Sequence, residues 1–121
     1  INNNLSKVIE NDIDIKTEIE YSDFDNLDYH TQLILFEYLI NISITSCIQV
    51  TNSDRIIIIK SVKTANKIIL KILYSCLSIN ESNIKKNINE ILLNKYSSLS
   101  IKELNNSYAS ILISFDISGS F

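Results

Sequence analysis

A single glycine and the complete absence of proline constrain this 121-residue chain more than any other feature. Glycine tolerates positive φ and proline presets φ, so these two residues normally make tight turns. Here asparagine, aspartate and serine must mark the turns instead. Their clusters, at 2–4, 22–26, 51–54, 80–83, 97–98 and 105–107, divide the chain into segments of ordinary length.

Isoleucine accounts for 25 residues, a skew typical of an AT-rich viral or microbial genome. Its spacing is therefore more informative than its number. The hydrophobic share of 45% and the charged share of 21% lie in the range of folded proteins. The length fits one domain, residues 1–121. Because the chain begins at Ile1 and contains no methionine, we expect a processed product or a piece of a longer protein.

Two segments alternate between apolar and polar residues, which is typical of half-buried strands. Residues 13–21 alternate isoleucine with charged residues, and residues 109–117 alternate apolar residues mainly with serine. The sequence therefore predicts a strand near each end of the chain, with Gly119 ending the second.

Three segments have helical spacing. They are 28–41, with Asp25 or Asp28 as N-cap, 64–78, and 83–95, with Ser82 as N-cap. Ser100 and Glu103 form an S-x-x-E capping box, which predicts a short helical turn.

The region between residues 42 and 62 fits two patterns. It is either a β-hairpin, with strands at 42–50 and 55–62, or a helix, a turn and a second helix. With the hairpin, the chain is an α+β protein with about four strands in an antiparallel or mixed sheet and helices packed on one face. With the helices, it is an all-α bundle of five to six helices.

Charge is unevenly distributed, since residues 1–50 carry a net charge of −7 (two bases, nine acids) and residues 51–121 carry +4 (nine bases, five acids). Lys63, Lys67 and Lys71 have the spacing of one helix face and are candidates for binding an anion or an acidic partner. Asp14, Glu18 and Glu20 form an acidic strand face that is a second candidate binding surface. Solvated surfaces are the alternative interpretation of both sets.

Several ligands are excluded or disfavoured. One glycine, at position 119, excludes the glycine-rich loops that cradle nucleotide phosphates. The aspartates at 23, 25 and 28 lack the turn glycine and final glutamate of a calcium loop. A pI near 5.0 and a single arginine argue against nucleic acid.

No catalytic residue, metal site or cofactor is predicted. A Cys47–His30 dyad is conceivable for nucleophilic catalysis, but no local motif supports it. Cys47 and Cys76 are predicted to be buried thiols, and no zinc-ligand spacing is present. No apolar run approaches a membrane span, and no signal peptide is visible, so a cytoplasmic location is favoured.

The small size and polarised charge predict a non-catalytic protein-binding module, such as a small inhibitor, an immunity-type protein or an adaptor, with a protein partner. The alternatives are a structural subunit or domain of a larger assembly, and a small enzyme or ligand-binding domain. The sequence leaves enzymatic activity and oligomeric state open.

Overall fold

The computed structural model describes residues 2–51, 54–105 and 107–117, with side chains from Ser6 onward. Its elements are α1 (Asn2–Glu10), β1 (Ile13–Glu18), the 3-10 helix η1 (Tyr21–Phe24), α2 (Tyr29–Ile48), β2 (Arg55–Lys63), β3 (Lys67–Ser75), α3 (Glu81–Leu92), β4 (Ser98–Leu104) and β5 (Tyr108–Asp116). Gly119, predicted to end the last strand, lies outside the described residues.

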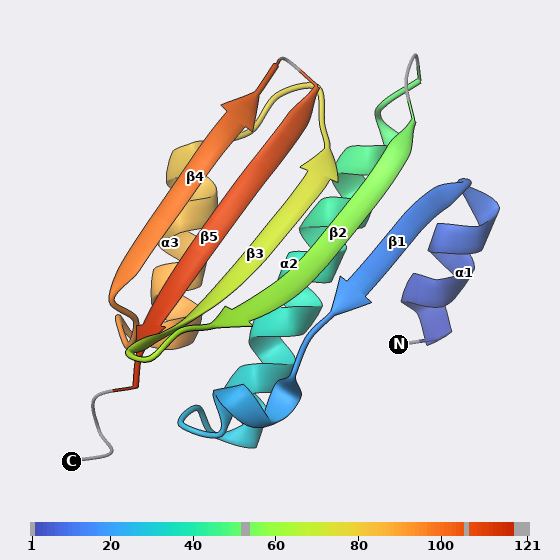
Figure 1. Ribbon diagram of the computed structural model, residues 1–121. Coiled ribbons are helices and arrows are strands. Elements are labelled where there is room, and N and C mark those ends of the chain that lie inside the picture. Colours follow the sequence, from blue (N-terminus) through green and yellow to red (C-terminus); the bar gives the residue numbers. More distant parts are fainter. Residues whose placement is uncertain (1, 52–53, 106, 118–121) are drawn as a thin grey trace.

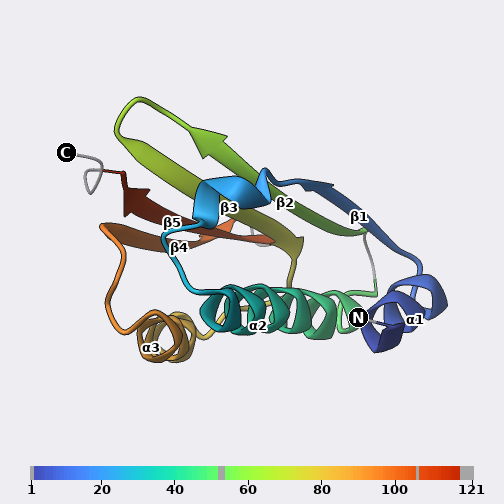
Figure 2. The same ribbon diagram turned by 90° about the horizontal axis from the view of Figure 1, so that it is seen from below.

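The strands form one mixed sheet in the order β1-β2-β3-β5-β4 (Figure 1). β1 runs parallel to β2, and the other neighbours are antiparallel. All three α-helices lie on the same side of the sheet, which leaves the opposite face open (Figure 2). The predicted α+β class, with helices on one face, is confirmed, and the sheet has five strands rather than about four.

The core lies between the sheet and the helices. Side chains of the covered face, such as Leu70 and Ile111, are completely buried. Leu39 of α2 and Ile88 of α3 are equally buried, because they face the sheet. Burial of such apolar side chains is the main source of stability in a domain of this size.

The helix α2 begins where the sequence predicts and continues much further. Asp28 caps it, since its carboxylate accepts a hydrogen bond from the Thr31 N–H at 2.8 Å. The hydrogen bonds that the Asp28 carboxyl accepts from Thr31 lower its pKa. The predicted strand at 42–50 is wrong, because Ile44 and Cys47 continue the buried helical face. The predicted strand at 55–62 is confirmed as β2.

Two predicted helical segments are strands. Residues 64–78 contain β3, whose inward residues Ile68, Leu70 and Ile72 alternate along the strand. These residues match both periodicities, and pairing with β2 on one side and β5 on the other selects the strand. The turn predicted at Ser100–Glu103 is part of β4, because it pairs with β5.

The remaining predictions are largely correct. The strands at 13–21 and 109–117 are present as β1 and β5, and the helix at 83–95 is α3, although Asn80 rather than Ser82 caps it. The helix α1 was not predicted. Asparagine and aspartate do mark turns, since three of the four described residues with positive φ are Asp12, Asn94 and Asn105.

The only arginine of the chain joins three segments near the start of β2. The Arg55 guanidinium donates to the carbonyls of Val50 at 2.9 Å, Asn11 at 2.8 Å and Ile48 at 3.1 Å. This clamp connects the α1–β1 turn and the end of α2 to the sheet. A planar guanidinium suits this task because its donors point in several fixed directions.

Candidate functional site

A groove of about 320 Å³ runs between α2 and α3 on the covered side of the sheet. The helix α2 forms one wall through a strip of polar and apolar residues, namely Tyr38, Asn41, Ile42, Thr45, Ser46 and Gln49. Helical spacing explains this wall, because residues three and four apart lie on one face. The buried residues of the same helix face the sheet instead.

The other wall and the floor come from segments far along the chain. Tyr74 of β3 belongs to the floor. The connector after β3 and the first turns of α3 supply the rest, namely Ser78, Ile79, Asn80, Asn83, Ile84 and Asn87. At the groove wall, Asn87 Nδ2 donates to the Tyr38 hydroxyl at 3.2 Å and so links the two helices.

No residue that lines this groove, among those described, is charged. Its polar groups are amides and hydroxyls, and several of them are free. The side chains of Asn41, Gln49 and Asn83 make no hydrogen bond to any described residue. Such groups can both donate to and accept from a ligand.

Tyr74 is the most unusual of these residues. It is 2% exposed, yet its hydroxyl makes no hydrogen bond to any described residue. Within the described part of the chain, no fully buried side-chain oxygen or nitrogen lacks a partner, so this hydroxyl reaches the groove. Burial raises the pKa of Tyr74, which keeps the hydroxyl protonated as a donor at neutral pH.

The two cysteines are unsuited to nucleophilic catalysis. Cys47 and Cys76 are free and buried, as predicted, and burial raises the pKa of each thiol. The reactive form of cysteine is the thiolate, which this shift disfavours. The His30–Cys47 pair is excluded, because these residues lie near opposite ends of α2, about 26 Å apart along the axis at 1.5 Å per residue.

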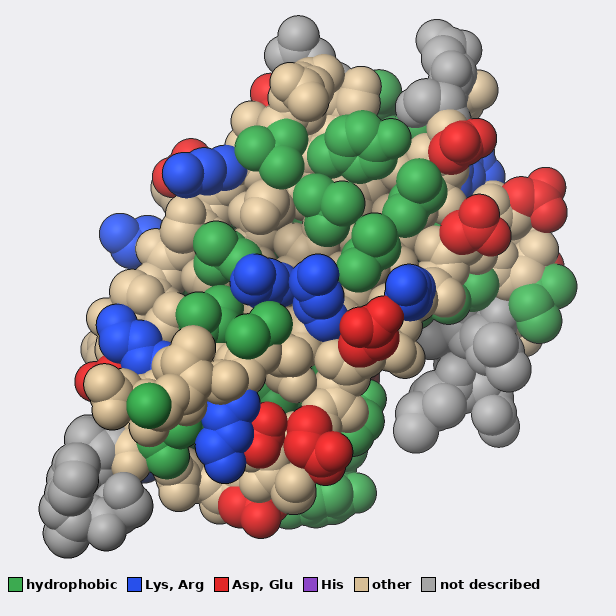
Figure 3. Space-filling view, in the orientation of Figure 1, with side chains coloured by type: hydrophobic (Ala, Val, Ile, Leu, Met, Phe, Trp, Pro, Cys, Tyr) green, Lys and Arg blue, Asp and Glu red, His purple; other side chains and the backbone are tan. Residues whose placement is uncertain are grey.

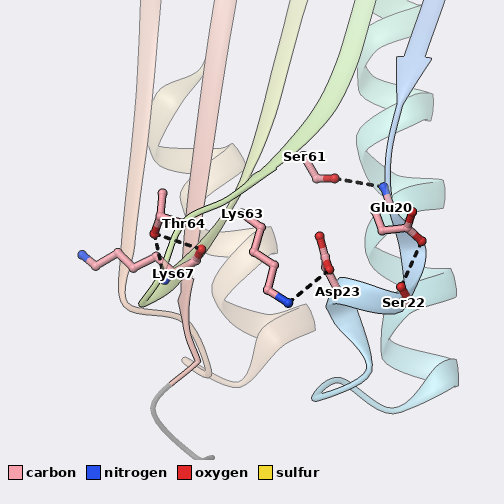
Figure 4. A network of polar contacts seen from close by, with 7 residues as sticks. All are labelled: Glu20, Ser22, Asp23, Ser61, Lys63, Thr64 and Lys67. Carbon is pink, nitrogen blue, oxygen red and sulfur yellow. Dashed lines mark hydrogen bonds and ion pairs between the residues drawn. The ribbon is translucent and has the colours of Figure 1, made fainter.

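The three candidate lysines do not form one helical stripe, because they lie on two strands. Lys63 Nζ lies 3.8 Å from Asp23 Oδ1, and Lys67 points away from this pair beyond the β2–β3 turn (Figure 4). Lys71 lies on the open face, where it is the direct partner of Lys60 across β2 and β3. Anion binding by these lysines stays a prediction.

The three candidate acidic residues lie on or just after the edge strand β1. Asp14 and Glu18 alternate on its open side, and Glu18 pairs with Lys16 at 3.1 Å. Glu20 accepts a hydrogen bond from the Ser22 hydroxyl at 2.9 Å (Figure 4). Glu18 and Glu20 therefore have local structural partners, and a role in binding for the three carboxylates stays a prediction.

The open face itself is a mixed surface. Apolar side chains gather on it and lysines lie between them (Figure 3). Among the described residues, no group of three or more histidine, cysteine, aspartate or glutamate side chains is placed to hold a metal ion.

One described helix, α2, is long and apolar enough to cross a membrane by length and composition. The sequence analysis predicts no such span. Core helices meet the same criteria, and α2 packs on the sheet through Leu35, Leu39 and Ile44.

None of the candidate binding residues predicted from the sequence lines the groove. Its residues come from α2, β3, the following connector and α3, and their amide and hydroxyl groups form no motif. The only signal is the recurrence of asparagine at positions 80, 83 and 87, which has helical spacing.

No protein-family model matches the sequence, and no curated protein matches it significantly. Solved structures do share the fold. The catalytic domain of the histidine kinase ThkA, in one nucleotide-free form, matches with a TM-score of 0.66 and 16% identity over 92% of this chain and 82% of that chain. A second nucleotide-free form gives 0.67 and 15%, over 92% and 84%. The Acinetobacter baumannii histidine kinase AdeS gives 0.63 and 14%, over 91% of this chain and 58% of that chain.

The chain therefore shares the α+β fold of histidine kinase catalytic domains. This finding corrects the predicted function. The predicted non-catalytic inhibitor, immunity-type protein or adaptor is wrong, because the similar solved structures are those of histidine kinases, including the catalytic domain of ThkA.

Proposed function

We propose that this chain is a ligand-binding domain that holds a nucleotide-type ligand in the α2–α3 groove. The observation that carries the proposal is the buried Tyr74, whose unpaired hydroxyl opens into a groove lined by free amides. The fold supports it, since the similar ThkA structures are described as nucleotide-free forms of a kinase catalytic domain. A protein partner, which the sequence analysis expects, stays a prediction beside this one.

A magnesium-bound triphosphate does not fit the residues of the groove. In phosphoryl transfer from a triphosphate, the protein mainly positions the phosphates and stabilises their charge with magnesium ions, carboxylates and a lysine. The described lining carries neither a carboxylate nor a cation. Phosphoryl transfer is therefore not part of the proposal.

The start of α3 does not replace the missing cations. A helix N-terminus attracts anions through its free N–H groups and its dipole. Here the Asn80 side chain already accepts from the Asn83 N–H at 3.1 Å, and Glu81 places a carboxylate in the first turn. Both features reduce the attraction for a phosphate.

Backbone amide NMR tests the proposal directly. The four common ribonucleosides and their magnesium triphosphates are titrated separately into the protein. We expect at least one of these compounds to shift resonances at 38–49 of α2 and 78–87 around the start of α3. Absence of binding by every compound, or shifts that map to the open face, would contradict the proposal.

A pair of variants provides the control. Thr45→Arg places a long side chain into the groove from an exposed helix position, and arginine favours a helix more than threonine does. Thr17→Arg makes the same change on the exposed edge strand β1. We expect Thr45→Arg to abolish the shifts and Thr17→Arg to preserve them. Equal binding by the two variants would place the ligand elsewhere.

A further inference from the structure

We infer, building on the proposed function, that the groove selects an uncharged nucleobase or nucleoside over any phosphorylated form, and that the Tyr74 hydroxyl orients the base. Three properties of the groove support this ligand class: its lack of charge, its free amides, and its mixture of aromatic and aliphatic walls.

The lack of charge discriminates against phosphates. An anion that leaves water loses hydration free energy, and only opposite charges or several hydrogen bonds replace it. The described lining offers no opposite charge, and the first N–H groups of α3 are partly occupied by Asn80. A neutral base or nucleoside avoids this cost.

The amides match the edge of a base. Each base presents adjacent donors and acceptors, and asparagine or glutamine pairs with such an edge through two hydrogen bonds. Asn41 and Gln49 lie on α2 and Asn83 lies opposite on α3, and none of these side chains is bonded to a described residue. The two walls therefore offer paired donors and acceptors.

The apolar part of the lining suits the flat faces of a base. Tyr38 and Ile42 come from α2, and Ile79 and Ile84 come from the opposite side. Proteins that bind bases outside a duplex place aromatic and apolar side chains against these faces. The volume of about 320 Å³ is at the lower end of the ~300–1,000 Å³ typical of small-molecule sites, which suits a nucleoside.

Tyr74 supplies a fixed contact in this site. Its ring is packed in the core at 2% exposure, so its hydroxyl has little freedom to move. Exposed amides on the helices, by contrast, can rotate. Because this hydroxyl reaches the groove and has no partner among the described residues, it can donate to an acceptor of the ligand.

Isothermal titration calorimetry with adenosine, guanosine, cytidine and uridine, and with their magnesium triphosphates, tests the ligand class. We expect one nucleoside to bind at least about tenfold more tightly than its own triphosphate. A triphosphate that binds as tightly as its nucleoside, or more tightly, overturns the inference and leaves the proposed function intact. No binding by any compound overturns both.

Tyr74→Phe tests the role of the hydroxyl, because it removes one oxygen and keeps the ring. We expect about tenfold weaker binding of the preferred nucleoside and an unchanged melting temperature of the free protein. The matched control is Tyr29→Phe, on an exposed residue outside the groove. Unchanged affinity in folded Tyr74→Phe removes Tyr74 from the site.

A second measurement, on the wild-type protein, tests the role of Tyr74 even if the Tyr74→Phe variant does not fold. Nuclear Overhauser contacts between the bound nucleoside and the Tyr74 ring are recorded in the wild-type protein. We expect contacts from the base protons. Contacts only to other tyrosines overturn the assignment.

Discussion

The two faces of the sheet contain similar side chains in very different surroundings. On the covered face, Leu70 and Ile111 are completely buried under α2 and α3. On the open face, their strand neighbours Ile69 and Leu112 are only half-buried, with Lys71 paired to Leu112. Lysine stems shield part of such a surface while their ammonium groups stay in water.

This difference explains why the sequence pointed to the open face and not to the groove. Charged residues are conspicuous in a sequence, and most of the candidate residues belong to the open face or its margins. The proposed groove is uncharged and lies between two helices that pack on the sheet. Its lining is therefore not visible as a charge pattern in the sequence.

The largest expected effect tests whether side chains packed on the covered face contribute more to the free energy of unfolding than side chains on the open face. Leu39→Ala removes a completely buried side chain of α2, and we expect it to lower the free energy of unfolding by about 3 kcal/mol. Leu104→Ala makes the same change at a 38% exposed residue of β4, where we expect a loss of about 1 kcal/mol or less. Urea denaturation measures both. Equal losses would mean that the open face is covered in solution.

A smaller effect tests the Arg55 clamp, which connects the α1–β1 turn and the end of α2 to the sheet. Arg55→Lys keeps the charge but loses the simultaneous bonds to Val50, Asn11 and Ile48. We expect a loss of about 2 kcal/mol in urea denaturation, because a lysine cannot satisfy all three carbonyls. The reverse change on the open face, Lys71→Arg, is the control, with an expected change of less than about 0.5 kcal/mol. Similar values for the two variants would show that the clamp contributes little.

The smallest effect tests the open face itself. Lys71 lies directly opposite Lys60, and like charges in this position are unfavourable. We expect Lys71→Gln to raise the free energy of unfolding by about 0.2–1 kcal/mol at low salt. The gain should shrink in 1 M NaCl because salt screens the repulsion. Lys85→Gln, on exposed α3, is the control. A destabilised Lys71→Gln would indicate that the lysines have favourable partners.

Much of the secondary structure follows from local spacing. Residues 13–18 and 109–116 alternate between apolar and polar residues, so β1 and β5 were predictable, although only Ile13 of β1 is buried. The buried residues Ile84, Ile88 and Leu92 have helical spacing, which made α3 predictable. The cap at Asp28 was predictable for the same local reason, since its side chain bonds within its own turn.

Other segments were ambiguous because their isoleucine and leucine residues fit both helical spacing and strand alternation. Residues 68–74 match a helix and a strand equally well, and only pairing with β2 and β5 decides between them. The second half of α2 alternates like a strand, but Ile44 and Cys47 bury against the sheet as a continuation of the helix. Tertiary context overrides such weak local preferences.

By itself, the sequence determined the two strands near its ends and the absence of a glycine-rich phosphate loop, and it favoured an α+β fold over an all-α bundle. The spacing of apolar residues and the types of turn residue settle these features within a short segment. Only the tertiary structure decided the α2–α3 groove, because Asn41, Tyr74 and Asn83 are brought together by the packing of two helices on a sheet. Single amides and a hydroxyl, each unremarkable in its own segment, become a candidate binding site when packing brings the exposed amides of two helices beside the mostly buried Tyr74.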